Sequence, residues 1–218
     1  PNDYLKPCVA MIEELINMYE VSAVLCTATQ PALDSFFVKK KPIELCPDLE
    51  EQFAFFQRVT YKNAGTLGEE ELLERLKEEY QVLCIVNTKK RAQKLYRELQ
   101  GEGVYHLSTS MYPAHRRRVL TAIRKRLKIR QCLEGEKRCV VIATSLVEAG
   151  VDLDFRTVYR QLAGVDSIIQ AAGRCNREGK KSAAESSVYI FQLDEKEYVP
   201  GQRQQIDVAK MLLGDQKK

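Results

Sequence analysis

The chain has 218 residues, a formal net charge of +4 and 44% hydrophobic residues. This length suffices for one α/β domain with an additional segment and excludes two large domains. No apolar run approaches the roughly 20 residues that cross a bilayer, so the composition suits a soluble, cytoplasmic protein without a membrane partner. The seven cysteines form no Cys-x-x-Cys pair, which favours buried, reduced thiols over disulfides or a zinc site.

The N-terminal part of the chain carries a helix pattern followed by a short apolar run. Residues 4–19 place Val9, Ile12, Leu15 and Ile16 at helical spacing and predict an amphipathic helix. The run SAVLC at residues 22–26 predicts a buried strand. Residues 38–51 contain two prolines and mixed charges, and this composition is typical of a linker.

The rest of the chain alternates between apolar runs and amphipathic stretches. We expect strands at residues 55–61, 82–87, 104–107, 138–144, 155–162 and 186–193. We expect helices at residues 68–80, 88–100, about 114–131 and 165–174. This alternation predicts an α/β fold with a parallel sheet covered by helices on both faces. Ligands of such sheets bind at the carboxyl ends of the strands, so the strand-to-helix turns are the places to search.

Two of these turns carry small polar residues. Asn87 and Thr88 end a strand and open a helix, and their types favour plain capping over phosphate binding, in which Lys89 would also take part. Ser108 and Thr109 follow the next short strand and also offer hydroxyl groups. Both turns are therefore candidate anion-binding positions, with capping as the alternative for the first.

A basic stretch follows the second turn. Between Arg116 and Arg130 the chain has eight Lys or Arg residues, Arg117 among them, and no acid. Such a run is usually a solvated helix face, with Val119, Ile123 and Leu127 on the buried side. The lack of any acid favours a polyanion partner, because solvated helices normally mix charges of both signs.

The third turn, after the strand at 138–144, combines several functional residue types. Thr144 and Ser145 end the strand, and Glu148, Gly150 and Asp152 follow. Gly150 permits a positive φ or a close approach of a ligand. Asp152 either binds a ribose hydroxyl or only stops a short helix, and the residues alone leave both open.

The fourth turn opens the helix at 165–174 and contains two arginines. Gln170 and Arg174 are four residues apart, and Arg177 follows three residues later, so a continuing helix would present all three on one face. Two guanidinium groups and an amide at one place suit a polyphosphate. The alternative is that the arginines pair with carboxylates of the core.

Together these stretches resemble the motifs of superfamily 2 helicases. The stretch QAAGRCNREG resembles motif VI, IATSLVEAGVDLDF motif V, CIVNTKK the motif IV region and TAT motif III. VLCTATQPAL, ATSLVEAGVDLDF and AGRCNREG together resemble the CRISPR-associated helicase–nucleases of type I systems. That family tends to have Asn between the two arginines, where Asn176 stands here.

The resemblance implies two RecA-like lobes with ATP and Mg²⁺ between them and single-stranded DNA across their tops. By motif, Arg177 would be the arginine finger and Arg174 its phosphate partner, and Gln170 would face the γ-phosphate or the attacking water. Gly150 and Asp152 would approach the nucleotide. The candidate DNA-binding residues are Asn87, Thr88, Lys89, Ser108, Thr109, Arg117, Thr144 and Ser145. Thr27 and Thr29 would couple the two sites, and no residue is assigned to a metal.

The other half of such a motor is not recognisable in the sequence. There is no Gly-x-x-x-x-Gly-Lys-Ser/Thr loop, no acidic magnesium motif before TAT and no HD nuclease motif. We therefore expect residues 1–45 to be a remnant of the first lobe with a linker, and residues 46–218 to be the second lobe.

The expected function is that of the second lobe of a 3′-to-5′ single-stranded DNA translocase or helicase in CRISPR interference. The chain alone would be inactive. Its partners would be the first lobe and HD nuclease domain of the same protein, and an RNA-guided surveillance complex. The alternatives are a non-enzymatic RecA-like binding module and the second lobe of a DEAD-box RNA helicase, although Asn176 and the TATQP wording argue against the latter.

Overall fold

The protein is described by a computed structural model that covers residues 2–27, 33–39, 41–46, 48–128, 137–148, 150–193 and 201–214. The chain divides into two compact units, residues 1–56 and residues 57–218, and each is described by itself. Within the described ranges, no helix is both long and apolar enough to cross a membrane.

The first unit contains two helices, α1 (Asn2–Tyr19) and α2 (Leu49–Phe55). The expected helix at 4–19 is confirmed. Its buried Glu13 accepts hydrogen bonds at Oε1 from the backbone N–H groups of Val38, at 2.8 Å, and Lys39, at 2.7 Å. The carboxylate therefore fixes the turn at 38–39 against the helix.

The expected strand at residues 22–26 is wrong, because this segment is irregular. An apolar run forms a strand only where a neighbouring strand supplies hydrogen bonds, and the described residues of the first unit include none. The linker expected at 38–51 ends earlier than predicted, since α2 begins at Leu49.

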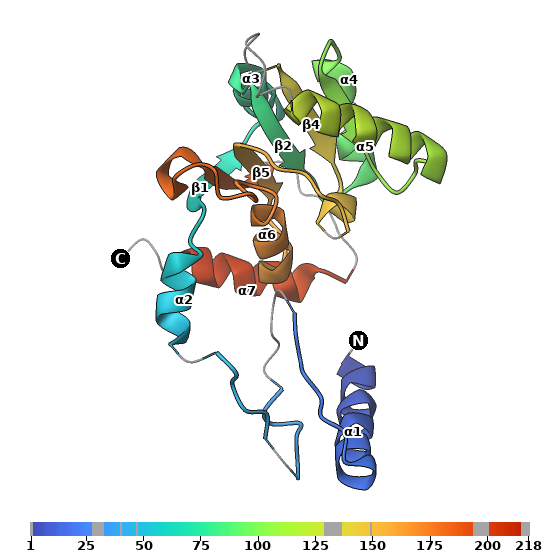
Figure 1. Cartoon of the computed structure of the whole chain (residues 1–218). Helices are drawn as coiled ribbons and strands as arrows, with labels where there is room; N and C mark the ends of the chain where they lie inside the picture. The colour runs from blue at the N-terminus through green and yellow to red at the C-terminus, as the bar shows by residue number, and fades with distance from the viewer. Residues whose placement is uncertain are drawn as a thin grey trace. The chain divides into compact units, whose positions relative to one another are not determined.

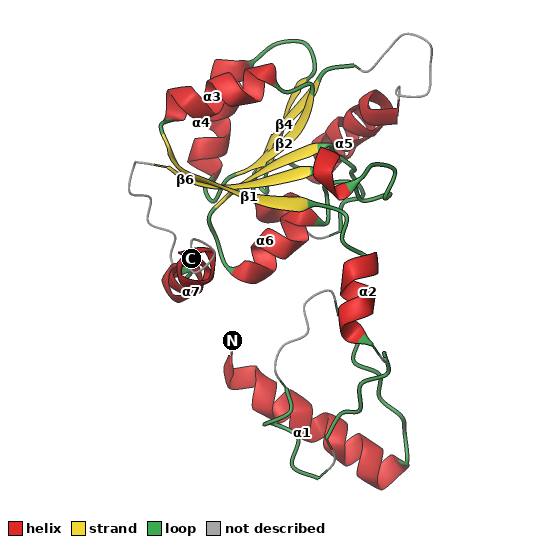
Figure 2. Cartoon of the chain, turned by 90° about the vertical axis from the view of Figure 1, so that its left-hand side faces the viewer, coloured by secondary structure: helices red, strands yellow, loops and turns green. Residues whose placement is uncertain are grey.

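The second unit is a six-stranded parallel sheet flanked by helices (Figures 1 and 2). The strands are β1 (Thr60–Leu67), β2 (Gln81–Ile85), β3 (Val104–Leu107), β4 (Cys139–Ala143), β5 (Thr157–Gln161) and β6 (Ser187–Leu193). The helices are α3 (Glu69–Glu78), α4 (Lys89–Leu99), α5 (Pro113–Lys128), α6 (Val165–Ala172) and α7 (Arg203–Gly214), with short 3₁₀ turns at Ser145–Val147 and Ala183–Glu185. The strand order is β1-β6-β5-β2-β4-β3, and every pair is parallel.

Alternating side chains of the buried strands build one core on each face of the sheet. In β2, Leu83 and Ile85 face a core that includes Ile123 of α5 and Ala171 of α6. Val82 and Cys84 face the opposite core, to which α3 and α4 contribute. Figure 2 shows α3 and α4 on one side of the sheet and α5 and α6 on the other. The predicted RecA-like fold, a parallel sheet with helices on both faces, is therefore confirmed.

One strand and two helices depart from the prediction for the second unit. The strand expected at 55–61 is wrong in position, because residues 49–55 are helical and β1 runs from Thr60 to Leu67. β1 is an edge strand with several exposed residues. Its sequence is therefore polar, and a search for apolar runs does not detect it. Helix α7 was not predicted, and α6 ends at Ala172 rather than at residue 174.

Candidate functional site

The turns after β2, β3 and β4 lie at one edge of the sheet, because all strands run in the same direction. At this carboxyl edge the backbone N–H of Thr144 donates to the carbonyl of Leu107 at 3.1 Å, which joins the ends of β4 and β3. The side-chain hydroxyls of Ser108 and Thr144 are buried without a hydrogen-bond partner. Thr109 and Ser145, one residue further along each turn, are exposed to solvent.

The turn after β2 is built largely for internal contacts. Asn87 donates from Nδ2 to the carbonyl of Leu162 at 2.9 Å and accepts at Oδ1 from Arg160 Nη1 at 2.7 Å. Thr88 is the N-cap of α4, and its hydroxyl accepts from the backbone N–H of Arg91 at 3.3 Å. The capping interpretation of this turn is therefore confirmed. Lys89 is exposed at the first position of the helix.

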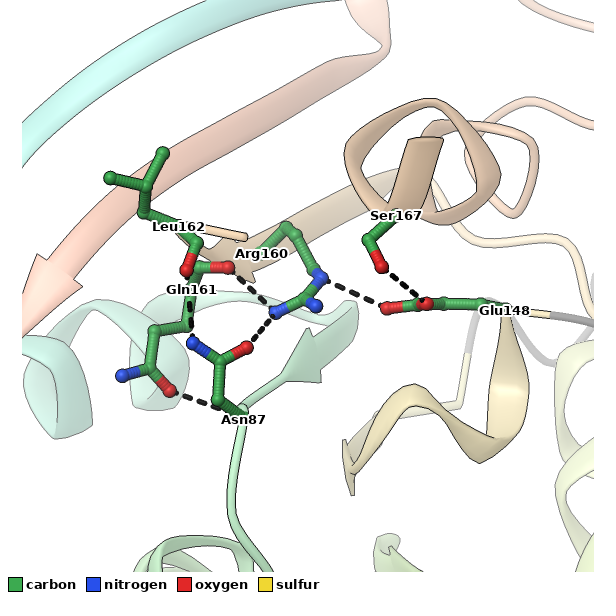
Figure 3. A network of polar contacts seen from close by, with 6 residues as sticks. All are labelled: Asn87, Glu148, Arg160, Gln161, Leu162 and Ser167. Carbon is green, nitrogen blue, oxygen red and sulfur yellow. Dashed lines mark hydrogen bonds and ion pairs between the residues drawn. The ribbon is translucent and has the colours of Figure 1, made fainter. Parts of the chain in front are cut away.

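A buried ion pair connects the third turn to β5 (Figure 3). Arg160 is 1% exposed, and its Nε lies 3.0 Å from Oε1 of Glu148, which is 7% exposed. The other carboxylate oxygen of Glu148 accepts from the hydroxyl of Ser167 in α6 at 3.0 Å. Arg160 Nη1 also donates to the carbonyl of Gln161 at 2.6 Å. With Asn87, which accepts from the same nitrogen, four segments of the domain meet at this pair: the turns after β2 and β4, β5 and α6.

The electrostatics of the pair follow from its burial. Burial raises the pKa of the Glu148 carboxyl group, and the nearby Arg160 and the Ser167 hydroxyl oppose that shift. Burial likewise lowers the pKa of Arg160, and the negative charge of Glu148 opposes the shift. Each charge is therefore stabilised mainly by the other, and removing one partner leaves an uncompensated buried charge.

The segment with the two arginines is a loop rather than a helix. Helix α6 ends at Ala172, Gly173 follows as its C-cap, and Asn176 has a positive φ of 46°. Between Gly173 and Asn176, Cys175 forms an isolated parallel β-bridge with Phe155, which lies two residues before β5. The helix does not continue as far as Arg177, so Gln170, Arg174 and Arg177 do not share one helix face.

The two arginines have different surroundings in this arginine loop, residues 173–179. Arg174 is 8% exposed and donates from Nη2 to the carbonyl of Glu148 at 2.7 Å, while its Nε is buried without a hydrogen-bond partner. Burial, followed by repulsion from Arg177, lowers the pKa of Arg174. The Arg177 side chain is 44% exposed, and its Nε lies 2.7 Å from Oδ1 of the more exposed Asp152.

This arrangement fits an anionic group. The guanidinium groups of Arg58, Arg174 and Arg177 lie around this loop against two carboxylates, those of Asp152 and Asp154, so the local charge is positive. Gly150, two residues before Asp152, has a φ of 67°, which glycine adopts without strain. Gln170 is half-buried on α6. Among the residues that the structure describes, no cluster of three or more His, Cys, Asp and Glu side chains could hold a metal ion.

Asn176 fixes the backbone that carries Arg177. Its Nδ2 donates to the carbonyls of Arg58, at 2.9 Å, and Lys181, at 2.6 Å, and its Oδ1 accepts from the N–H of Lys181 at 3.1 Å. Arg177 itself is held at both backbone groups, since its N–H donates to Asp154 Oδ1 at 2.8 Å and its carbonyl accepts from Arg58 Nη1 at 2.5 Å. The loop is therefore fixed while the side chain of Arg177 remains accessible.

Helix α5 presents the predicted basic surface. Arg117 is exposed, as are Arg118, Arg124, Lys125 and Lys128. Ile123 is fully buried on the opposite side of the helix, with Val119 and Leu127 half-buried beside it, as the spacing predicted. Arg126 is used internally, because it pairs with Glu102 at 2.7 Å and donates to the carbonyl of Arg138.

The two predicted coupling residues belong to the first unit. Thr27 is exposed, and Thr29 lies outside the described residues. Their placement relative to the arginine loop is not defined, so their coupling role stays a prediction.

Sequence reasoning missed Arg58, Asp154, Arg160 and Ser167. Arg160 left a signal, since a charged residue inside the apolar run VYRQL must find a partner if the strand is buried on both faces. Arg58 and Asp154 left none, because their contacts with the arginine loop depend on the strand order.

The parallel sheet with helices on both faces defines the domain as RecA-like, and a solved structure shares this fold. Residues 78–180 match the family model described as the C-terminal part of the CRISPR-associated nuclease/helicase Cas3. The resemblance to the CRISPR-associated helicase–nuclease family is thereby confirmed. A relative from Haloferax volcanii, described as CRISPR-associated nuclease/helicase Cas3, is 43% identical over 77 residues, which cover 34% of this chain and 8% of the relative.

Solved structures show the same fold. A structure of T. fusca Cas3 with AMPPNP superposes with a TM-score of 0.55 at 18% identity, over 73% of this chain and 22% of that one. A chain of a CRISPR RNA-guided surveillance complex in a pre-nicking state gives a TM-score of 0.52 at 19% identity, over 73% and 23%. The chain thus spans less than a quarter of the length of each of these proteins.

Proposed function

We propose that this chain supplies the second lobe of an ATP-dependent, 3′-to-5′ single-stranded DNA motor that acts in CRISPR interference. A first RecA-like lobe completes the nucleotide site. The observation that carries the proposal is the arginine loop, which is fixed through Asn176 and leaves the guanidinium of Arg177 exposed. The backbone of this loop needs no rearrangement when a nucleotide arrives, and only the Arg177 side chain has to leave Asp152.

The residues of this chain have distinct parts in the nucleotide site. ATP with Mg²⁺ supplies the phosphoryl group that is transferred to water, and the first lobe holds the metal. Arg177 leaves Asp152 and neutralises charge that develops on the γ-phosphate, while the buried charge of Arg174 adds to the local positive potential. Gln170 orients the phosphate or the water, and Gly150 and Asp152 approach the nucleotide.

The DNA strand follows the carboxyl edge of the sheet in this proposal. Lys89, Thr109 and Ser145 are exposed there, and they bind the phosphates directly. Asn87, Thr88, Ser108 and Thr144 shape the turns from within, since they cap, join strand ends or lie buried. Arg117 and its exposed neighbours on α5 extend the positive surface.

The descriptions of the relatives support a proposal for the wider assembly. Curated relatives are described as nuclease/helicases, and one structural match comes from an RNA-guided surveillance complex. We therefore propose that the chain works in the cytoplasm beside a first motor lobe and an HD nuclease domain, and that a surveillance complex recruits it. Alone, the chain hydrolyses no ATP, because the phosphate loop and the magnesium ligands belong to the other lobe.

The test is ATP hydrolysis by this chain combined with a first RecA-like lobe, with and without single-stranded DNA. Arg177→Ala should lower kcat by about 10³–10⁵, because an arginine finger stabilises transition-state charge. Binding of single-stranded DNA, measured by fluorescence anisotropy, should change little. Lys180→Ala is the matched control. Lys180 directly follows the arginine loop, and its exposed positive charge pairs with Glu178 rather than with Asp152.

A normal rate of ATP hydrolysis in the Arg177→Ala variant would show that Arg177 is not the arginine finger. If no first lobe supports hydrolysis, the chain is a non-enzymatic RecA-like binding module instead. Stimulation by single-stranded RNA but not by DNA would favour the RNA helicase alternative.

A further inference from the structure

The ion pair between Glu148 and Arg160 lies between the proposed DNA-binding edge of the sheet and the arginine loop of the proposed nucleotide site. Arg160 comes from the end of β5, and through Asn87 it contacts the turn after β2. Glu148 follows the turn after β4, and through Ser167 it contacts α6. Figure 3 shows these side chains converging on the guanidinium and the carboxylate. The pair therefore joins the carboxyl ends of three neighbouring strands to the helix that leads to the arginine loop.

Glu148 also contacts the arginine loop directly. Its carboxylate binds Arg160 and Ser167, and its backbone carbonyl accepts from Arg174 Nη2 at 2.7 Å. Only two residues separate Glu148 from Ser145, which is exposed at the DNA edge. A displacement of this turn by a bound strand would therefore reach Arg174 through a single residue.

A purely structural role explains the pair poorly. Two charges that are almost fully buried lose their hydration, and well-packed apolar residues of similar volume often stabilise a fold as much or more. What apolar residues could not supply is directed contact with several segments at once. The donors of Arg160 bind Glu148, Asn87 and the carbonyl of Gln161, and these acceptors belong to three different strand ends.

We propose that Glu148 and Arg160 are positioning residues that transmit the binding of single-stranded DNA at the carboxyl edge to Arg174 and the arginine loop. This inference rests on the proposed function, because it assigns a link between its two sites. The measurable consequence is the stimulation ratio, defined as the rate of ATP hydrolysis with saturating DNA divided by the rate without DNA.

The experiment uses the complete motor with three changes in this chain: Glu148→Gln, Arg160→Met and the two combined. The single variants leave one buried charge unpaired, and thermal unfolding should show that both lose stability. The double variant removes both charges and should recover most of that stability. Its stimulation ratio should nevertheless fall by at least ~5-fold, the lower end of typical coupling between two sites.

A second ion pair in the same domain is the control. Arg91 of α4 pairs with Glu69 of α3, and both are largely buried on the opposite face of the sheet. Glu69→Gln combined with Arg91→Met should change the melting temperature without changing the stimulation ratio. Ser167→Ala removes only the contact between Glu148 and α6, so it tests the inference even if a single-charge variant fails to fold.

The outcomes separate the two levels of the proposal. A stable double variant with a normal stimulation ratio would overturn the inference and leave the proposed function intact. A reduced ratio in the Glu69/Arg91 control would also overturn it, because any lost ion pair would then have the same effect. Hydrolysis that DNA does not stimulate in the unchanged motor would overturn both the inference and the proposed DNA motor.

Discussion

At the scale of single residues, Asn176 shows how the sequence specifies the arginine loop. Its φ of 46° lies in the left-handed region, which Asn tolerates better than most residues other than Gly. Unlike Gly, it also makes three hydrogen bonds to the backbone of Arg58 and Lys181. The residue between the two arginines therefore supplies both the turn and its anchor.

Substitution of Asn176 should separate these two contributions. Asn176→Gly keeps the turn but removes the hydrogen bonds, which contribute about 1 kcal/mol each, and should lower the free energy of unfolding by about 1–3 kcal/mol. Asn176→Ala should cost about 1 kcal/mol more, because alanine is strained at positive φ. Urea unfolding of the two variants measures the difference. Equal stabilities of the two variants would exclude a strain effect, and a glycine variant as stable as the original would show that the hydrogen bonds contribute nothing.

The sequence revealed the residue types of the site better than their contacts. The arginines were singled out because guanidinium groups suit a polyphosphate, Gly150 because it permits a positive φ or a close approach, and Asp152 because a carboxylate can bind a ribose hydroxyl. The partners of Glu148 and Arg160 were not, because a residue on β5 meets the turn after β4 only through the packing of β2 between them. Spacing along one segment does not carry that information.

At the scale of elements, the buried helices and strands were predictable because their apolar periodicity is strong. The errors fall where tertiary structure overrides the local pattern. Phe55 and Phe56 suggested a strand but are exposed and lie at the end of α2, whereas the polar strand β1 is held by β6. The apolar run at 22–26 forms no strand because the described part of its unit offers no strand to pair with.

Helix α5 allows a test of its partner at the same scale. If its exposed face binds single-stranded DNA, log Kd should rise by about 0.7 per log unit of salt for each phosphate neutralised. Arg117→Ala should lower that slope by about 0.7. Arg97→Ala is the matched control, because Arg97 is also exposed but belongs to α4 on the opposite face of the sheet. Anisotropy titrations at several salt concentrations give both slopes, and a flat salt response of the unchanged chain would make α5 a solvated surface.

At the scale of the whole molecule, the cysteines show which parts of the chain are buried from solvent. Cys84 and Cys139 are buried as the sequence predicted, whereas Cys26, expected in a strand, is exposed. Burial raises the pKa of the thiols of Cys84, Cys139 and Cys175 to about 12. These thiols are therefore protonated and inaccessible near neutral pH.

A thiol reagent at pH 8 should accordingly modify Cys8 and Cys26 promptly and the three buried cysteines only after unfolding. Mass spectrometry of peptides from samples quenched at intervals identifies the modified sites. The same reaction in denaturant is the control, because all these thiols should then react. Rapid modification of Cys84 in the folded chain would contradict the two-sided packing of β2.

The sheet order could not have been predicted from the sequence, since alternation of strands and helices is compatible with many arrangements. It has a consequence for synthesis on the ribosome. β1 emerges first but pairs only with β6, which is made more than a hundred residues later and fills the place between β1 and β5. The backbone N–H and C=O groups of β1 therefore stay without a strand partner until β6 has been synthesised. During that time a chaperone could bind the unpaired strand.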